Sequence, residues 1–461
     1  MDGQKSAAKW LAIILLVSIS IFSYAMYDSF FVSNSGKVQG ENTTPTDSTI
    51  ITPPVDDKEE PPKVVYSILP RPALKLGTTT IQHTGGYGEE VLLATHHISS
   101  TTIAILQTAS NSFDYKAENH LALALFDNEQ LISTLIFSDK DETFIDSKIS
   151  SSGIVILTKT ATNICKLRLF SPTIIPKGEV ALDLNGNAIS SASFYLDNTS
   201  LLLFALTDSQ IICKSVSSTL ALSDYCAPFN ISNSSIVSIQ KVNGNFVLAL
   251  NSEAEEISVI NIISMTAANG FILEKTVADQ RAISLNIAVE DNVPFFLLTS
   301  KTQSAICIQK LSITFGTLFS HLFEGVNSAM VSQTSNGFVA VTPTSIYFLC
   351  RHLDSFYVQN LYEIEIGKEN EFDTVKSLLY FGGKHYSLLY SSTTHNACLI
   401  EINSFAIHSL YLFGAENSTI SMNVGTNSLR ILFTTALRDG IFASSFGGKD
   451  VFYVAIDTTI K

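Results

Sequence analysis

The stretch at residues 191–217, SASFYLDNTSLLLFALTDSQIICKSVS, holds three short apolar runs separated by two groups of turn-forming residues. The interruptions fall at Asp197-Asn198-Thr199 and at Thr207-Asp208-Ser209, and these residue types favour tight turns. Apolar runs of this length between turn residues are typical of β-strands. The stretch therefore predicts three strands joined by two turns, which is most of a four-stranded antiparallel sheet.

Comparable groups of apolar runs return along the chain as far as its C-terminus. Their second runs recur about every 47 residues and centre on Ile105, Val155, Leu202, Val247, Phe296, Val339, Leu388 and Ile431. Five of the six cysteines fall in the third run of a unit and so follow the same period: Cys165, Cys213, Cys307, Cys350 and Cys398. Repeats of this length with four strands each predict the blades of a β-propeller.

In this architecture the chain resembles the eight-bladed β-propeller superfamily over residues 76–461. The resemblance implies an all-β fold of about eight four-stranded antiparallel blades, with seven blades as the alternative. It does not extend to a named family, because the Gly-His and Trp-Asp signatures of WD40 repeats are absent from the sequence. The single tryptophan, Trp10, precedes the repeats.

The composition narrows the classes of function. The chain has 46% hydrophobic residues, enough to bury a full core, and only 15% charged residues. Its formal net charge is −14, and no cluster of Lys and Arg appears. Because nucleic-acid binding depends on basic contacts to phosphates, we expect no nucleic-acid partner.

The N-terminus carries a targeting segment with two interpretations. Residues 1–9 contain Lys5 and Lys9, and residues 10–32 are largely apolar. As a transmembrane signal anchor, the segment leaves residues 1–9 in the cytosol and the C-terminus in the lumen or outside the cell, a type II single-pass topology. As a cleaved signal peptide, with small residues Ser23 and Ala25 at the cleavage positions, it releases a secreted protein. We favour the anchor because aromatic residues extend the apolar stretch.

Residues 33–75 predict a stalk between this segment and the propeller. They are rich in Pro and Thr and include the acidic run Asp56-Asp57-Lys58-Glu59-Glu60. Closely spaced prolines favour extended, unpaired backbone, and like charges repel one another. Within them, residues 64–69 (VVYSIL) can pair as an added edge strand.

The secretory route allows two covalent modifications. Cys226 follows Cys213 by 13 residues, in the strand expected next in the same blade, so a cross-strand disulfide is a candidate. Candidate glycosylation sites occur at five N-x-[ST] sequences: Asn42, Asn198, Asn230, Asn233 and Asn417. Asn198 falls in a hairpin turn, and Asn230, Asn233 and Asn417 are expected in loops between blades.

Polar motifs that could carry chemistry are few. His96 and His97 are adjacent on the expected first strand of blade one, so their side chains point to opposite faces and cannot bind one metal together. The run Asp139-Lys140-Asp141-Glu142 lies between units one and two and is interpreted as a solvated charge run. We expect no cofactor and no metal site.

These observations predict a membrane-tethered, lumenal or extracellular propeller that acts as a binding or scaffold module without catalysis. Its ligand is expected to be a protein or a glycan. The candidate contact surface combines Phe113 and Tyr115, in the longest loop of unit one, with Asp139 and Asp141. The alternative is an enzyme that acts on glycans, similar to glycoside hydrolases, with carboxylates around the central channel.

Overall fold

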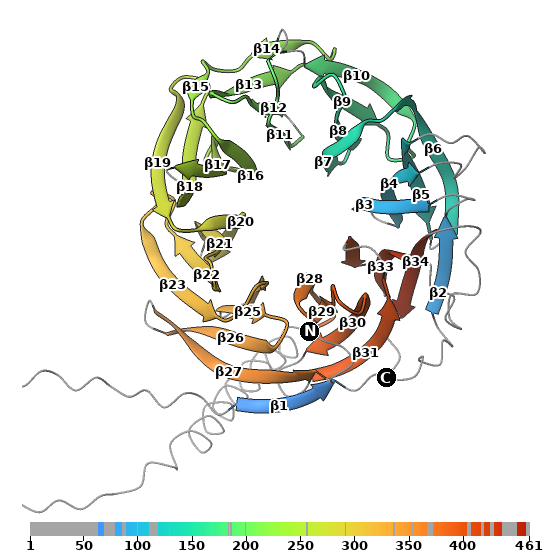
Figure 1. Cartoon of the computed structure of the whole chain (residues 1–461), viewed down its shortest axis with the longest axis vertical. Coiled ribbons are helices and arrows are strands. Elements are labelled where there is room, and N and C mark those ends of the chain that lie inside the picture. The colour runs from blue at the N-terminus through green and yellow to red at the C-terminus, as the bar shows by residue number, and fades with distance from the viewer. Residues whose placement is uncertain are drawn as a thin grey trace, which may run out of the picture. The chain divides into compact units, whose positions relative to one another are not determined.

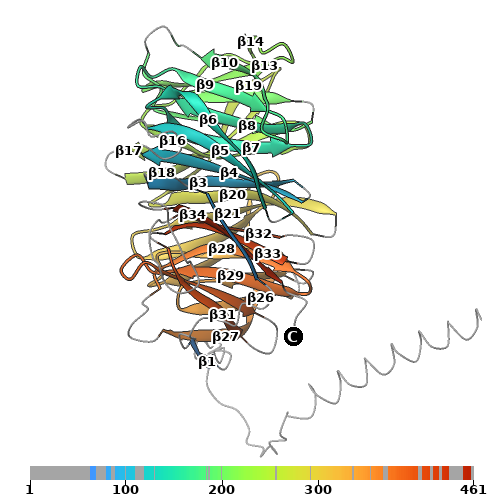
Figure 2. The same cartoon turned by 90° about the vertical axis from the view of Figure 1, so that its right-hand side faces the viewer.

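The computed structural model describes residues 63–68, 79–84 and 89–457, except for 99, 110–118, 129, 183, 185–186, 199, 255–256, 291, 335–336, 353–354, 367–371, 403–406, 416–418, 425–427 and 436–449. All of the regular elements within these residues are β-strands. They form eight sheets arranged as a ring around a central channel (Figure 1). Seen from the side, the strands run across the thickness of a disc (Figure 2). The expected eight-bladed propeller is confirmed.

The first four blades follow the chain in order, each as an antiparallel sheet running from the channel outward. Blade 1 contains β3 (Glu89–Ile98), β4 (Thr101–Ala109), β5 (His120–Asp127) and β6 (Gln130–Lys140); blade 2 contains β7 (Thr143–Ser150), β8 (Gly153–Lys159), β9 (Cys165–Phe170) and β10 (Pro176–Leu182). Blade 3 contains β11 (Ser191–Leu196), β12 (Leu201–Leu206), β13 (Gln210–Val216), β14 (Leu222–Asp224) and β15 (Phe229–Asn230); blade 4 contains β16 (Ser234–Val242), β17 (Asn245–Ala254), β18 (Ile257–Thr266) and β19 (Gly270–Ala278). The three strands expected within residues 191–217 are β11, β12 and β13.

The last four blades complete the ring. Blade 5 contains β20 (Arg281–Glu290), β21 (Val293–Lys301), β22 (Ala305–Leu311) and β23 (Thr317–Glu324); blade 6 contains β24 (Met330–Thr334), β25 (Gly337–Val341), β26 (Ser345–His352) and β27 (Ser355–Ile366). Blade 7 contains β28 (Thr374–Phe381), β29 (Lys384–Tyr390), β30 (Asn396–Ile402) and β31 (Ile407–Gly414); blade 8 contains β32 (Ile420–Val424), β33 (Ser428–Thr435) and β34 (Asp450–Asp457).

Two strands from before blade 1 join sheets at the end of the chain. β2 (Thr79–Thr84) pairs antiparallel with β34 and supplies the fourth strand of blade 8, from Thr79↔Ile456 to Thr84↔Val451 (Figure 1). The eighth repeat therefore does not supply all four of its own strands. β1 (Lys63–Ile68) pairs in parallel with β27 and gives blade 6 a fifth strand, which confirms the edge strand expected there.

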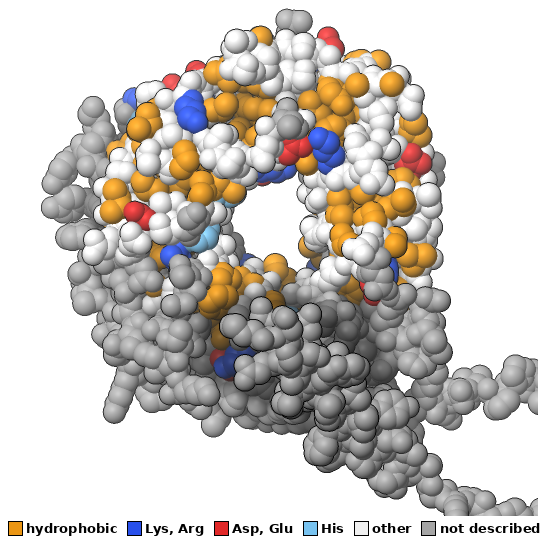
Figure 3. Space-filling view, turned by 180° about the vertical axis from the view of Figure 1, so that it is seen from behind, with side chains coloured by type: hydrophobic (Ala, Val, Ile, Leu, Met, Phe, Trp, Pro, Cys, Tyr) orange, Lys and Arg blue, Asp and Glu red, His pale blue; other side chains and the backbone are white. Residues whose placement is uncertain are grey.

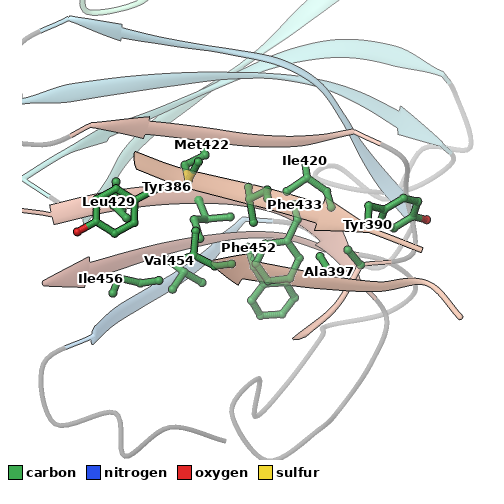
Figure 4. Close-up of a cluster of buried hydrophobic side chains, with 14 residues drawn as sticks. Tyr386, Tyr390, Ala397, Ile420, Met422, Leu429, Phe433, Phe452, Val454 and Ile456 are labelled. Atoms are coloured by element: carbon green, nitrogen blue, oxygen red, sulfur yellow. The ribbon is translucent and has the colours of Figure 1, made fainter. Parts of the chain in front are cut away.

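The hydrophobic core is divided among the interfaces between successive blades. Eight clusters of buried side chains each combine residues of two neighbouring sheets. Figure 4 shows the cluster between blades 7 and 8, where Tyr386 and Tyr390 of β29 lie with Met422 of β32 and Phe433 of β33. Burial of these side chains on both faces of each sheet holds the blades together.

The innermost strands share a local irregularity. The pairing of β3, β7, β16, β20 and β28 with their second strands shifts by one residue near the start of the inner strand. Such β-bulges bend a strand and redirect the following side chains. In blades 2 and 4 the shift comes just before Asp146 and Ser238, so the bulges help to aim channel-lining residues.

Three hairpins between third and fourth strands share one turn. The hydroxyl groups of Ser171, Ser217 and Ser312 each accept a hydrogen bond, 3.0 Å long, from the backbone N–H four residues later. The residue just before that N–H has a positive φ: 57° at Ile174, 63° at Leu220 and 64° at Phe315. Each of these three side chains, here called tip residues, joins the apolar cluster shared with the preceding blade.

Within the described residues, no helix is long and apolar enough to cross a membrane. The expected anchor at residues 10–32 lies outside them, as does most of the expected stalk.

Candidate functional site: the channel cavity and the blade surfaces

A cavity of about 470 Å³ opens on the channel side of blades 2, 3 and 4. It is lined by the inner strands β7, β11 and β16, with polar side chains from Asp146, Lys148, Ser193, Ser238 and Gln240. The centre of the ring is open in the space-filling view (Figure 3). Because each inner strand alternates between the two faces of its blade, polar residues at these positions lie beside the channel while their neighbours enter the apolar clusters.

The charged groups of this cavity are engaged with one another and with the next blade. Asp146 accepts hydrogen bonds of 2.8 Å from the Ser193 hydroxyl of blade 3 and from the Ser147 N–H, and its Oδ2 lies 3.7 Å from Lys148 Nζ. Lys148 also donates to the carbonyl of Phe194. Burial lowers the pKa of Lys148, although Asp146 acts in the opposite direction. The arrangement provides polar contacts and one compensated charge pair.

Two carboxylates for glycoside hydrolysis are not brought together in this cavity. Hydrolysis of a glycosidic bond normally needs an acid and a second carboxylate as nucleophile or base. Asp146 is the one carboxylate in the described lining, and Lys148 accompanies it. Gln240 contributes an amide that already donates to the Leu285 carbonyl of blade 5, at 2.9 Å.

His96 and His97 point to opposite sides of blade 1, as the strand alternation predicts. His96 Nε2 lies 2.6 Å from the Ser147 hydroxyl of blade 2, whereas His97 Nδ1 accepts from Arg430 of blade 8 at 2.8 Å. Burial lowers the pKa of His96, against the charge of Asp146, and burial together with Arg430 lowers that of His97. Both histidines therefore connect blade 1 to its neighbours.

Two carboxylates of the acidic run at the end of β6, Asp139 and Glu142, form an ionic cluster between blades 1 and 2, rather than belonging to a free solvated charge run. Glu142, with 1% of its side chain exposed, is paired with Arg168 of β9, whose side chain is 8% exposed. Arg168 donates to Glu142 Oε1 at 2.9 Å, to Asp139 Oδ2 at 2.5 Å and to the Thr158 hydroxyl at 2.9 Å. Lys166 donates to Asp139 at 2.6 Å.

The ionisation of this cluster follows from its contacts. The hydrogen bond from Lys166 lowers the pKa of Asp139 and raises that of Lys166. Burial by itself would lower the pKa of Arg168, but the hydrogen bond and attraction to Glu142, together with the charges of Glu179 and Asp139, raise it. Of the four residues expected to form a contact surface, Asp139 is held inside this cluster, and the backbone N–H of Asp141 donates to the Asn119 carbonyl at 3.1 Å. Phe113 and Tyr115 lie outside the described residues.

The expected modification sites are placed as follows. Asn198 lies in the β11–β12 turn, and Asn198, Asn230 and Asn233 are all exposed. Asn230 is in β15, paired with Gln210, and not in a free loop as expected. Asn42 and Asn417 lie outside the described residues, and glycosylation stays a prediction.

The third-strand cysteines lie in the strands expected for them, whereas Cys226, expected in the following strand, lies between β14 and β15. Cys165, Cys213, Cys307 and Cys398 are buried in the third strands of their blades. Cys226 is half-buried and packs against the cluster that contains Cys213. Both are free thiols in the structure, so the bridge between them stays a prediction.

A feature missed from the sequence is the concentration of exposed apolar side chains on blades 4 and 5. Ten of the thirteen large hydrophobic residues described as exposed fall between Ile257 and Met330. Six of these ten lie in or near turns at the same end of the strands. These six residues are here called the blade 4–5 patch: Ile272, Leu273, Val289, Val293, Ile313 and Leu318. Lys275 of β19 donates to the Phe315 carbonyl at 3.0 Å, so the outer edges of the two blades adjoin there.

The sequence contained a signal for this patch that the strand analysis did not use. In β23 (TLFSHLFE), apolar residues occupy both alternating positions. Phe323 is buried, while Leu318 is 55% and Leu322 46% exposed. Apolar residues on both faces of an outer strand leave one set exposed where no neighbouring sheet covers that face.

Comparisons with known proteins bear on the fold. No protein-family model matches the sequence, and no curated protein matches it significantly. Among solved structures, Sqt1 of Saccharomyces cerevisiae has a TM-score of 0.51 at 11% identity, covering 80% of this chain and 97% of Sqt1. The propeller of Dos1 has a TM-score of 0.52 at 11% identity, covering 81% of this chain and 94% of the Dos1 chain. The similarity covers almost the whole of the Sqt1 and Dos1 chains and supports the propeller fold. With its eight observed sheets, the chain is an eight-bladed β-propeller.

Proposed function

We propose that this protein is a non-catalytic binding module that presents its propeller to a protein partner. The observation that carries the proposal is the blade 4–5 patch, where Val293 is 61%, Leu318 55% and Val289 53% exposed. Apolar side chains gathered on one part of a surface are typical of protein interaction sites. The ring supports this role because the blades are fixed to one another by continuous apolar clusters.

The channel cavity supports binding better than catalysis. The one carboxylate in its described lining, Asp146, is compensated by Lys148 and by the Ser193 hydroxyl. An enzyme that acts on glycans would need a second carboxylate near the first. The cavity therefore offers hydrogen-bonding groups for a polar segment of a partner, without the paired acids of a glycoside hydrolase.

The proposed setting is the secretory pathway, with the chain tethered as a type II membrane protein and its propeller in the lumen or outside the cell. The apolar segment at residues 10–32 motivates this proposal. The exposed positions of Asn198, Asn230 and Asn233 are compatible with glycans. Recovery of the intact N-terminus from membranes, together with a mass decrease after enzymatic removal of N-linked glycans, is the expected result. A mature chain that begins after Ala25 would exclude the anchor.

The binding function is tested by affinity capture with the immobilised full chain and membrane extracts. A variant with Val293→Ser and Leu318→Ser is expected to lose the partner captured by the native protein. Ile132→Ser, at a position 57% exposed on blade 1, is the matched control and is expected to retain it. Equal capture by the patch variant and the control would remove the patch from the proposal. Turnover of glycans by the purified chain, with no stable partner, would exclude the binding function.

A further inference from the structure

The outer edge of blade 3 is interrupted, unlike the outer edges of its neighbours. It consists of β14, with three residues, and β15, with two. By contrast, β10 of blade 2 has seven residues and β19 of blade 4 has nine, both without a break. A short edge segment with few ladder hydrogen bonds opens locally more often than a long one.

Cys226 lies within this interruption, beside Cys213. The pairing of β14 with β13 ends at Lys214↔Asp224, and that of β15 with β13 begins at Ile211↔Phe229. The four residues 225–228 of the outer path therefore lie beside only two residues of β13, Ile212 and Cys213. The Tyr225 N–H donates to the Cys213 carbonyl at 3.1 Å, which fixes the path immediately before Cys226.

The two cysteine side chains belong to the same apolar cluster. Cys213 is 1% exposed and lies between blades 3 and 4 with Phe246. Cys226 packs against this cluster from the interrupted edge and is half-buried. The Cys213 thiol is thus fixed in a continuous strand, whereas the Cys226 thiol lies in the segment between β14 and β15.

We propose that Cys213 and Cys226 form a disulfide bond that fastens the interrupted outer edge of blade 3 to β13. The oxidant is a low-molecular-weight disulfide such as glutathione disulfide. The Cys226 thiolate attacks one sulfur of glutathione disulfide, whose S–S bond breaks and releases one glutathione thiolate. The Cys213 thiol then loses its proton, and its thiolate attacks the Cys226 sulfur and releases the second glutathione. Two protein thiols are oxidised, and one glutathione disulfide is reduced to two thiols.

The order of the two steps follows from exposure. Cys226 can be reached by solvent, whereas Cys213 is enclosed. Burial raises the pKa of both thiols, and the neighbouring Cys226 adds to the effect on Cys213. Since the thiolate is the attacking form, the exchange is expected to be slow near neutral pH and faster in alkaline solution.

Other buried cysteines provide internal controls. Cys165 and Cys398 occupy third strands of blades 2 and 7 and have the same burial as Cys213. Stacked sheets lie about 10 Å apart, beyond the reach of a disulfide between equivalent positions. These two thiols are expected to stay reduced under the same treatment.

The proposal is tested on the purified full chain after reduction and then incubation with glutathione disulfide. The chain is unfolded, its free thiols are alkylated, and its peptides are mapped by mass spectrometry without reduction. The native chain is expected to lose two of its six alkylatable thiols, with a peptide that links Cys213 to Cys226. Cys398→Ser is expected to retain this link. Cys213→Ser is expected to carry glutathione on Cys226. Six free thiols in the oxidised native chain, or a link between other cysteines, would overturn the proposal.

A second measurement tests the role of the bond. Amide hydrogen exchange at Tyr225 and Ile231, which donate to backbone carbonyls of Cys213 and Ser209, is expected to slow about tenfold on oxidation because local opening is restricted. In Cys226→Ser the same treatment is expected to leave exchange unchanged. Equal exchange rates in the reduced and bridged native chain would overturn the fastening role.

Discussion

The interface between blades 1 and 2 and the region of blades 4 and 5 use the same repeat in different ways. Between blades 1 and 2, Arg168 binds the enclosed carboxylate of Glu142 and the half-buried carboxylate of Asp139 in one ionic cluster. On blades 4 and 5, side chains such as Val293 and Leu318 remain exposed. The difference shows that an interface between blades can include a charge cluster that fixes geometry beside its apolar residues. Positions that no neighbouring blade covers can carry apolar groups that are free to contact a partner.

The largest change in the free energy of unfolding is expected when Arg168, at the centre of the ionic cluster, is replaced. Arg168→Met leaves the carboxylate of Glu142 enclosed without its main partner, and loss of one member of a buried pair costs about 3–5 kcal/mol. Urea unfolding should show this decrease. Lys214→Met is the matched control, because its partner Asp224 is 74% exposed and such surface pairs contribute about 0–1 kcal/mol. Equal losses in the two variants would contradict the structural role of the cluster.

A smaller difference is expected from a methyl group added near two tip residues, Leu220 of blade 3, which contacts blade 2, and Phe315 of blade 5. A Cβ at Gly178 would lie 2.4 Å from Leu220 Cδ1, and Gly178 has a φ of +144°. Gly178→Ala is therefore expected to lose about 1–3 kcal/mol. At Gly316, beside Phe315 of blade 5, the nearest atom is the Ser312 hydroxyl at 3.3 Å. Gly316→Ala should lose clearly less in the same unfolding experiment. Relief of the Gly178→Ala effect by Leu220→Ala would identify the contact responsible.

Acidification is expected to lower the free energy of unfolding through His96, at the interface between blades 1 and 2. Burial lowers the pKa of His96 below the value of 6.5 that it has in the unfolded chain. The unfolded chain therefore binds more protons as the pH falls below 6.5, so the free energy of unfolding decreases there. His96→Gln should reduce this pH dependence, measured by denaturant unfolding across the interval. Burial also lowers the pKa of His321 on blade 5. Comparison with His321→Gln therefore shows how much of the pH dependence comes from His96 on blade 1 and how much from blade 5. An unchanged slope in His96→Gln would contradict the assignment.

The smallest effect on stability is expected from a substitution in the blade 4–5 patch. Leu318→Ser should change the free energy of unfolding by less than about 0.5 kcal/mol, because substitutions at exposed positions have little effect. Leu298→Ala, at a fully buried position of the same blade, should lose about 2–5 kcal/mol. A large loss for Leu318→Ser would show that this side chain contributes to packing instead of presenting a free surface.

Local patterns predicted much of the fold. The turn residues around Asp197 and Thr207 separate β11, β12 and β13 as expected, and the period of the third-strand cysteines matches four sheets with buried thiols. Strand alternation also placed His96 and His97 on opposite sides of blade 1. These predictions succeed because strand length, turns and side-chain alternation depend on neighbouring residues.

The candidate site was less predictable, since its contacts join residues distant in sequence. Asp139 looked available for a partner until Lys166 and Arg168 were found on the adjacent blade. The patch was missed because the exposure of a side chain near a turn or on an outer strand depends on whether another sheet covers it. Neither property follows from the residue itself.

The sequence by itself determined the repeated strands, their turns and their apolar faces, because these features arise from short-range backbone and side-chain preferences. Only the tertiary structure decided that β2 completes blade 8, that β1 adds to blade 6 and that Glu142 of the acidic run is enclosed. The physical reason is that each of these contacts joins separate units of the repeat. β2 meets β34 because the closed ring brings together the two ends of the propeller sequence, whereas Glu142 meets Arg168 because blades 1 and 2 pack against each other.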